Sequence, residues 1–197
     1  VAPPGPPGQL RVVLIARMLW DKGVGEFVAA ARILKARGTD ARFVLVGAPD
    51  PENRASIGEQ QLRVWQAEGV VDWLGHRTDV ADILAAAHIV ALPSYREGLP
   101  KSLLEALAAA RPIITTDVPG CREVVKPGEN GLLVPVRDAA ALAQALDALI
   151  RDKALRQRFG RQSRLFAEAE FGVDRVTSET LDVYASLLAV APTLKHR

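Results

Sequence analysis

Two carboxylates flank the predicted start of a helix in the segment 97–105, Glu97-Gly-Leu-Pro-Lys-Ser-Leu-Leu-Glu105. Gly98 allows close approach to the backbone, and Pro100 suits the first position of a helix, whose free N–H groups can face an anion. The eight positions from Glu97 to Glu105 span about 12 Å at a rise of about 1.5 Å per residue, similar to a sugar nucleotide. One carboxylate could accept hydrogen bonds from sugar hydroxyls and the other from ribose hydroxyls. A helix with an acidic flank and a solvent-facing Glu105 would have the same residues.

Two cations, Arg17 and Lys22, occupy the turn that follows the first predicted strand. Arg has a planar guanidinium group with several N–H donors, and Lys has a compact positive charge. Both could therefore hold one diphosphate beside the helix predicted to begin at Gly23. Cations in a loop are more often only solvated, so this pair alone does not define a site. The formal net charge of +2 gives no general attraction to nucleic acid or membrane, so any anion site must be local.

Short apolar runs alternate with helical patterns and predict an α/β fold: a doubly wound, Rossmann-like parallel sheet of about six strands flanked by helices, with extra C-terminal helices. Near-continuous apolar runs at 12–15 and 43–46 indicate strands buried on both faces. The expected strands are 11–16, 42–47, 70–75, 89–93, 112–116 and 131–136. The expected helices are 23–37, 55–68, 79–87, 101–110, 139–151, 154–169 and 174–189. Ligands in such sheets bind beyond the C-terminal strand ends, where Arg17, Lys22 and Glu97 fall.

Helix boundaries follow from single residues. Gly38 is expected to stop the helix before it, and Asp79 and Asp138 are expected near helix N-termini. The last helical pattern carries Leu181, Tyr184 and Leu188, for which we expect core packing, with partial exposure as the alternative.

Several classes of protein are disfavoured by residues that the sequence has or lacks. A single cysteine, Cys121, excludes an intramolecular disulfide and a multi-cysteine zinc site, and it fits a reducing compartment. No apolar run approaches the roughly 20 residues of a spanning helix, and the Pro-rich start is unlike a signal peptide. The turn at 17–23 lacks the Gly-x-Gly-x-x-Gly pattern of nicotinamide- or flavin-dependent oxidoreductases. We expect His76 and His88 to be structural.

Ordered segments across residues 11–150 resemble the retaining glycosyltransferases of the GT-B fold called family 4 or glycosyl transferases group 1. The hallmark is two glutamates separated by seven residues, Glu97 and Glu105, after the strand end Leu92-Pro93-Ser94. The other matching segments are Ala16-Arg17 with Asp21-Lys22-Gly23, Leu74-Gly75 with Asp79-Val80, 111–120 with Glu123-Val124-Val125, and 128–134.

The resemblance implies a role for each matching residue. Arg17 and Lys22 would hold the donor diphosphate and stabilise it as a leaving group, so that no metal and no cofactor beyond the donor is needed. Glu97 would bind the hydroxyls of the donor sugar, and Glu105 would bind the ribose. Arg77 and its neighbours would bind the nucleobase. The residues that would approach the phosphates and sugar through their backbone are Gly98, Leu99, Pro100, Lys101, Ser102 and Leu103. Lys101 departs from the family, in which this position is often apolar.

The resemblance also implies a division of the chain. Residues 1–9 would be an inter-domain linker, 10–170 the nucleotide-sugar-binding domain, and 171–197 a helix that packs back towards an N-terminal acceptor domain outside this chain. Such a fragment would bind donor and transfer little or nothing.

Segments 95–100 and 117–123 are similar to bacterial members that build lipopolysaccharide, capsule or lipid-linked oligosaccharide, commonly from UDP-N-acetylhexosamines. We also expect a cytoplasmic location, association of the full-length enzyme with the inner membrane face, and no nucleic-acid partner.

Two alternatives remain from the sequence. One is a nucleotide-sugar epimerase or phosphorylase of the same two-domain architecture. The other is a non-enzymatic Rossmann-like interaction domain, because fold alone does not imply function.

Overall fold

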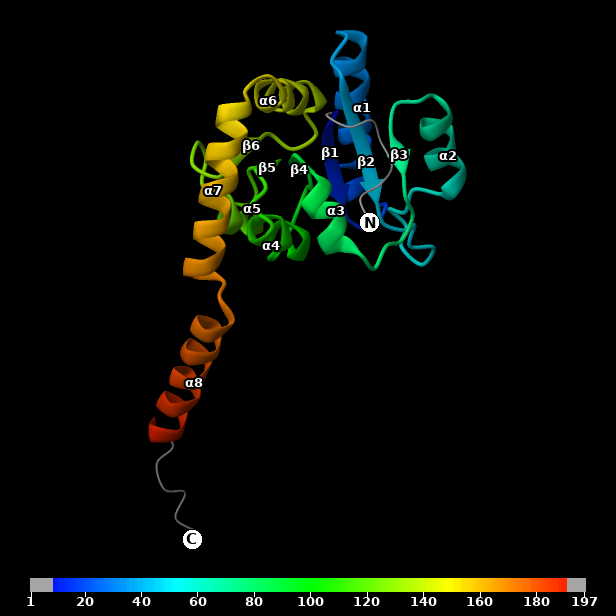
Figure 1. Cartoon of the computed structure of the whole chain (residues 1–197). Coiled ribbons are helices and arrows are strands. Elements are labelled where there is room, and N and C mark those ends of the chain that lie inside the picture. Colours follow the sequence, from blue (N-terminus) through cyan, green and yellow to red (C-terminus); the bar gives the residue numbers. More distant parts are fainter. Residues whose placement is uncertain (1–8, 191–197) are drawn as a thin grey trace.

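The computed structural model describes residues 9–190 (Figure 1). The predicted linker 1–9 therefore lies outside the described residues except for Gln9. Six strands form one sheet, all of whose pairs are parallel, in the order β3-β2-β1-β4-β5-β6. They are β1 (Leu10–Ile15), β2 (Ala41–Val46), β3 (Asp72–Trp73), β4 (Ile89–Leu92), β5 (Ile113–Thr116) and β6 (Gly131–Val134). The predicted doubly wound fold is confirmed, and the strand order reverses between β1 and β4.

Helices follow the strands, and most of them match the predicted positions. They are α1 (Val24–Ala36), α2 (Glu59–Ala67), α3 (Val80–Ala86), α4 (Lys101–Ala108), α5 (Pro119–Val124), α6 (Ala139–Arg151), α7 (Lys153–Glu170) and α8 (Val173–Val190), with a 3-10 turn η1 (Trp20–Lys22). Gly38 follows α1 with φ of +74°, a conformation that few other residues adopt, which confirms it as the stop. Asp138 caps α6 by accepting a hydrogen bond of 2.8 Å from the Ala141 N–H.

The structure corrects the start of one helix and the position of one proline. Helix α2 begins at Glu59 instead of Ala55, because the backbone before it is bound to the turn after β1. The Trp20 N–H donates to Ala55 O at 2.9 Å, and the Ile57 N–H donates to Met18 O at 2.8 Å. Pro100 was expected to suit the first helical position but is instead the residue before α4, with extended ψ of 108°. The first helical residue is Lys101, as the predicted range 101–110 has it. Helix α5 and turn η1 were not predicted, because they are too short to show a helical period.

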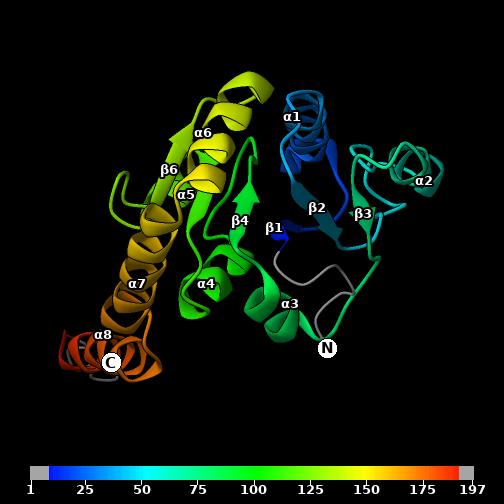
Figure 2. The same ribbon diagram turned by 45° about the horizontal axis from the view of Figure 1, so that its top comes forward.

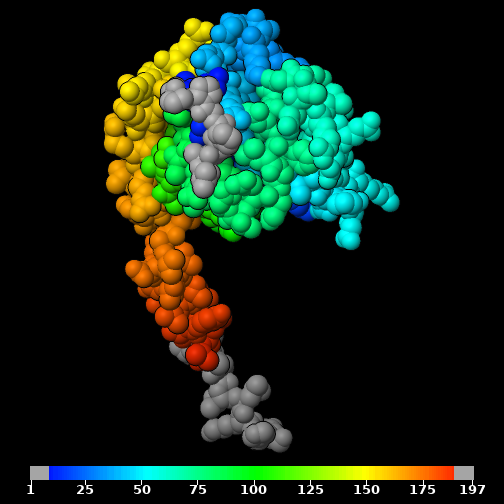
Figure 3. All heavy atoms as spheres, turned by 45° about the vertical axis from the view of Figure 1, so that its right-hand side comes forward, coloured from blue at the N-terminus to red at the C-terminus, as the bar shows by residue number. Residues whose placement is uncertain are grey.

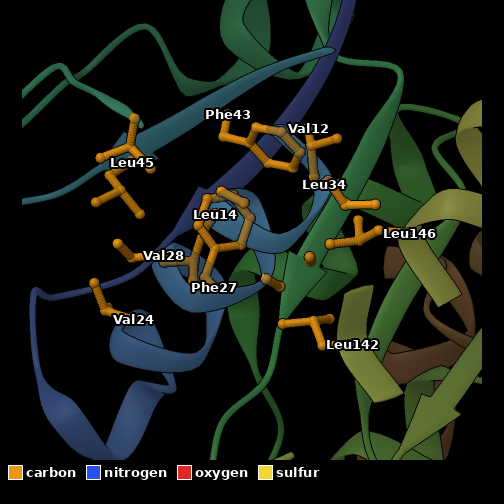
Figure 4. Packing of buried hydrophobic residues seen from close by; sticks show 14 of the residues in the cluster. Val12, Leu14, Val24, Phe27, Val28, Leu34, Phe43, Leu45, Leu142 and Leu146 are labelled. Atoms are coloured by element: carbon orange, nitrogen blue, oxygen red, sulfur yellow. The ribbon is translucent and has the colours of Figure 1, made fainter. Parts of the chain in front are cut away.

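Helices cover both faces of the sheet (Figure 2). On one face, α1 packs beside α6, and α6 contacts β5 and β6. Figure 4 shows Phe27 and Leu34 of α1 in the same apolar cluster as Val12 and Phe43 of the sheet. The rings of Phe27 and Phe43 meet edge to face at 5.9 Å. The other face packs against α3, α4 and α5. This burial fixes the strands, so the loops at their C-terminal ends start from fixed positions.

The two C-terminal helices differ in their environment. Helix α7 packs along α4 and α6, whereas α8 projects away from the sheet (Figure 1; Figure 3). Leu181 and Tyr184 are each 59% exposed and Leu188 is 77% exposed, so the expected core packing of these side chains is wrong and the alternative of exposure is confirmed. The reason is that other helices already occupy both faces of the sheet.

Candidate functional site

A cavity of about 490 Å³ lies where the ends of β1 and β4 meet. Neighbouring strands diverge towards their helices at such a point and leave a crevice. The cavity wall includes Ile15, Ala16 and Leu92 from the strand ends. The predicted site residues that line it are Arg17, Lys22, Glu97, Pro100, Lys101, Ser102 and Glu105. The structure therefore brings together residues that are up to 88 positions apart in the sequence (17 to 105).

Lys22 and Glu97 form an ion pair in this cavity. Lys22 Nζ donates to Glu97 Oε1 at 2.7 Å, and the side chains are only 21% and 10% exposed. The backbone supports the pair, because the Tyr95 N–H donates to Asp21 O at 2.8 Å and joins the two loops. A carboxylate accepts hydrogen bonds at both oxygens, so Glu97 can bind Lys22 through one and a ligand hydroxyl through the other.

Arg17 lies at the boundary between this cavity and a second one of about 430 Å³. Its Nη1 donates to Asp50 Oδ2 at 2.6 Å, while the Asp50 N–H is held by Ser56 Oγ at 2.9 Å. The guanidinium is more than half exposed. An anion that enters either cavity can therefore reach Arg17.

Arg77 lines the second cavity with His76, apart from Glu97 and Lys22. Its Nε donates to Asp79 Oδ1 at 2.7 Å. This hydrogen bond from Arg77 is the main reason that the pKa of Asp79 falls to about 2. Asp79 occupies the N-cap position of α3, as expected, but makes no side-chain cap hydrogen bond.

The first turn of α4 presents its residues in different directions. Lys101 Nζ lies 3.4 Å from Glu105 Oε1 on the exposed side of the helix. Leu103 is fully buried, and its N–H donates to Pro100 O at 3.0 Å. Leu99 is exposed beside Gly98, where an added Cβ would meet no atom within 4 Å. The space beside the Gly98 backbone is thus open to a ligand.

Residues of β5 and α5 hold the loop after β4, a supporting role that was not predicted from the sequence. A Cβ on Gly120, in the first turn of α5, would lie 2.1 Å from Gly98 O and 2.4 Å from Glu97 O. Thr116 Oγ1 also donates to Ser94 O. The Pro119-Gly120 dipeptide after a strand was the available signal, since glycine permits close backbone approach.

On the other side of the loop, Tyr95 is held from two directions. Its hydroxyl donates to Glu26 Oε1 at 2.6 Å, and the Arg137 guanidinium lies 4.7 Å from the ring centroid. Burial, followed by the carboxylate of Glu26, raises the pKa of Tyr95. Tyr95 therefore anchors the loop that carries Glu97.

Two features are absent from residues 9–190. No three His, Cys, Asp or Glu side chains within this range are grouped so that they could hold a metal ion. No helix in the described part of the chain has the length and apolar character to cross a bilayer.

Residues 9–152 match the model of a protein family described as "Glycosyl transferases group 1". The chain is 39% identical over 145 residues to the N,N'-diacetylbacillosaminyl-diphospho-undecaprenol alpha-1,3-N-acetylgalactosaminyltransferase of Campylobacter jejuni, covering 74% of this chain and 36% of that protein. It is 28% identical to the capsular polysaccharide biosynthesis glycosyltransferase CapM of Staphylococcus aureus, covering 88% of this chain and 45% of CapM. The crystal structure of Anabaena HepE in complex with UDP superimposes with a TM-score of 0.81 at 23% identity, covering 90% of this chain and 49% of HepE. The chain thus spans less than half the length of these proteins.

Proposed function

Because the chain belongs to the glycosyl transferases group 1, we propose that it is the nucleotide-sugar-binding domain of a retaining glycosyltransferase. One observation carries the proposal: Arg17, Lys22, Glu97 and Glu105 line a single cavity at the point where the strand order reverses. The two cations can then bind the diphosphate of one ligand, while the two carboxylates bind its sugar and ribose hydroxyls.

The donor would lie along the C-terminal edge of the sheet. Its diphosphate lies near Lys22 and Arg17, its sugar against Glu97 and the open backbone at Gly98, and its ribose at Glu105. The nucleobase extends past Arg17 into the second cavity, beside Arg77. The shared wall at Arg17 supports this continuous path.

The two cations would act on the departing diphosphate. When the bond between sugar and diphosphate breaks, negative charge increases on the leaving oxygen, and cations already in place stabilise that charge. Lys22 is held by Glu97 before the donor binds, so its ammonium needs little reorganisation. Glu97 meanwhile keeps its second oxygen for the sugar.

We propose a UDP-sugar as donor, with a hexose or N-acetylhexosamine as the transferred group. The Campylobacter relative is named for N-acetylgalactosamine transfer to a lipid diphosphate, and HepE was crystallised with UDP. By extension, the acceptor is a lipid-linked saccharide or another saccharide in cell-surface glycan synthesis. The free Cys121 is compatible with a cytoplasmic, reducing location.

The division of the chain is part of the same proposal. Residues 10–170 bind the donor, and 171–197 contact an acceptor-binding domain that this chain does not include. The exposed apolar residues of α8 support this assignment, and so does the greater length of the relatives. The isolated chain would then bind donor with little transfer.

Calorimetric titration tests the proposal. The chain is titrated with UDP, GDP, UDP-glucose and UDP-N-acetylglucosamine, and we expect binding of UDP and at least one UDP-sugar. Absence of binding by every nucleotide at millimolar concentration would exclude the donor-domain function. Product analysis with the longer protein and a lipid-linked acceptor would separate transfer from epimerisation.

A further inference from the structure

The cavity of about 490 Å³ lined by Arg17, Lys22 and Glu97 is called the donor cavity below. A third cavity, of about 380 Å³, lies at the opposite edge of the sheet and is called the cationic cavity. His88 precedes β4 and Arg111 precedes β5, so both lie at the N-terminal ends of the strands, whereas the donor cavity lies at the C-terminal ends of β1 and β4. Helix α7 supplies the facing wall. The polar residues that line this cavity are His88, Arg111, Lys153, Arg156, Gln157 and Arg161.

Positive charge dominates this wall, and no lining residue is acidic. Arg111 donates to neutral carbonyls, from Nη1 to Ala87 O at 2.9 Å and from Nε to Ala109 O at 2.8 Å. Arg156 Nη1 likewise donates to two carbonyls at the end of α6, Leu149 O and Ile150 O, at 2.6 and 2.7 Å. These contacts orient both guanidinium groups without neutralising them, and each keeps further N–H donors.

The positive charges are partly desolvated. Burial lowers the pKa of Arg111 and of Arg156, the latter opposed only by Asp152. Asp152 is occupied as the cap of α7, where its Oδ1 accepts from the Leu155 N–H at 2.8 Å. The pKa of His88 is lowered by burial first, and then by the charges of Arg156, Arg111 and Arg11. Asp152 offsets part of the charge of Arg156, but the several cations of the lining still leave a net positive potential for an anion placed here.

Tight packing forms the cavity in advance. A Cβ on Gly160 would lie 2.5 Å from Ala110 O, so α7 directly contacts the loop before β5. Ser163 Oγ donates to Arg111 O at 2.8 Å and fixes the same contact. Binding would consequently need little ordering of the wall, which favours affinity.

We propose that this cavity binds a phosphate group carried by a larger molecule, either a soluble phosphomonoester or a lipid phosphate headgroup. Arg and Lys are the side chains suited to phosphate oxygens, through paired hydrogen bonds and a point charge. At about 30 Å³ per water molecule, the volume corresponds to about a dozen waters, which exceeds a bare phosphate. The cavity shares no residue with the donor cavity, so both sites can be filled together.

The test reverses the charge of two cations that the fold does not need. Lys153 and Arg161 are exposed, and no side-chain hydrogen bond or ion pair joins either to another described residue. The double variant Lys153→Glu, Arg161→Glu is compared with Arg158→Glu, a charge reversal on the same helix outside the cavity. Inorganic phosphate and glycerol 3-phosphate are titrated by calorimetry at matched ionic strength. Flotation measures binding to phosphatidylcholine vesicles with and without phosphatidic acid.

We expect the parent chain and Arg158→Glu to bind the soluble phosphates or the phosphatidic acid vesicles. The double variant should lose affinity for the same ligand by about tenfold or more. Binding of the soluble phosphates alone would identify a soluble ligand, and binding of the vesicles alone a lipid. Binding of neither, or equal binding by the double variant, would overturn the proposal.

NMR of the parent chain gives a second measurement that does not depend on the variant. The Arg111, Gly160 and Arg161 amides must shift with glycerol 3-phosphate or with short-chain phosphatidic acid, whichever source binds, and shifts elsewhere only would also overturn it.

Discussion

The charged residues of the donor cavity are each paired with an opposite charge. Lys22 is held by Glu97, Arg17 by Asp50, and Glu105 by Lys101. Of these pairs, the first is the least exposed, so it is the least screened by solvent and salt. A ligand that offers both an anion and hydroxyl groups can engage Lys22 and Glu97 together without leaving either charge unpaired.

The two glutamates should separate by ligand. Glu105→Gln is expected to weaken UDP and UDP-sugar equally, because both ligands carry the ribose. Glu97→Gln should weaken UDP-sugar by about tenfold, the value of about one hydrogen bond to a charged group, and leave UDP nearly unchanged. Calorimetry of both ligands with both variants measures this difference. Equal losses for UDP and UDP-sugar in Glu97→Gln would contradict the assigned roles.

Arg77 should control the titration of Asp79. The pKa of Asp79 in the folded protein is about 2, below the ordinary value of 3.8. The pair with Arg77 therefore stabilises the fold at pH values above 3.8, and this contribution is lost as the pH falls towards 2. In Arg77→Ala we expect the pKa of Asp79 to return towards its ordinary value. NMR titration of the Asp79 carboxyl carbon between these pH values measures it. An unchanged pKa would show that another group lowers it.

At the scale of elements, the loop after β4 is held by contributions from two other strand ends. The turn after β1 supplies Asp21 O for the Tyr95 N–H, and β5 with α5 supplies Thr116 and Gly120. The position of Glu97 is thus a property of three neighbouring strands, which is why the short helix α5 belongs to the site although no lining residue of the donor cavity comes from it.

Two glycine substitutions should both weaken binding but differ in their effect on stability. Gly98→Ala adds a methyl group where no protein atom lies within 4 Å, so we expect an unchanged unfolding temperature with weaker UDP-sugar binding. Gly120→Ala forces a methyl group against two carbonyl oxygens, so we expect destabilisation of about 1–3 kcal/mol together with weaker binding. Thermal unfolding and calorimetry of the two variants provide the comparison. A stable Gly120→Ala variant with full affinity would show that the loop tolerates displacement.

At the scale of the whole molecule, a packed body and one projecting helix have different roles. Both faces of the sheet are covered by α1 to α7, and the donor cavity and the cationic cavity lie at opposite edges of that body. Helix α8 carries exposed Val173, Leu187 and Leu188. Such an apolar face is typical of a surface that contacts another protein part.

Deletion of residues 173–197 should therefore leave the body folded. Because the apolar side chains of α8 are exposed, their removal takes little buried area from the body, and we expect an unchanged unfolding temperature and UDP affinity. Calorimetric scanning and UDP titration of the shortened chain measure both quantities. A fall of several degrees would mean that α8 stabilises the donor-binding body.

The sequence by itself determined the strands, most of the helices and the two segments that meet at the donor cavity. These features depend on local patterns: apolar runs such as 12–15, the helical period of α1, and the spacing from Glu97 to Glu105. Backbone geometry converts such patterns directly into elements, and the parallel sheet then places Arg17 and Glu97 at one edge.

Only the tertiary structure decided which side chains contact each other across long stretches of sequence. Lys22 and Glu97 are 75 positions apart, and Gly120 supports a loop more than 20 positions earlier. The start of α2, the short helix α5 and the exposure of Leu181 depended in the same way on surfaces supplied by distant segments. The cationic cavity arose where α7 returns to the start of β5. Contacts of this kind leave no periodic signal, because the free energy that fixes them belongs to the packed pair and not to either segment alone.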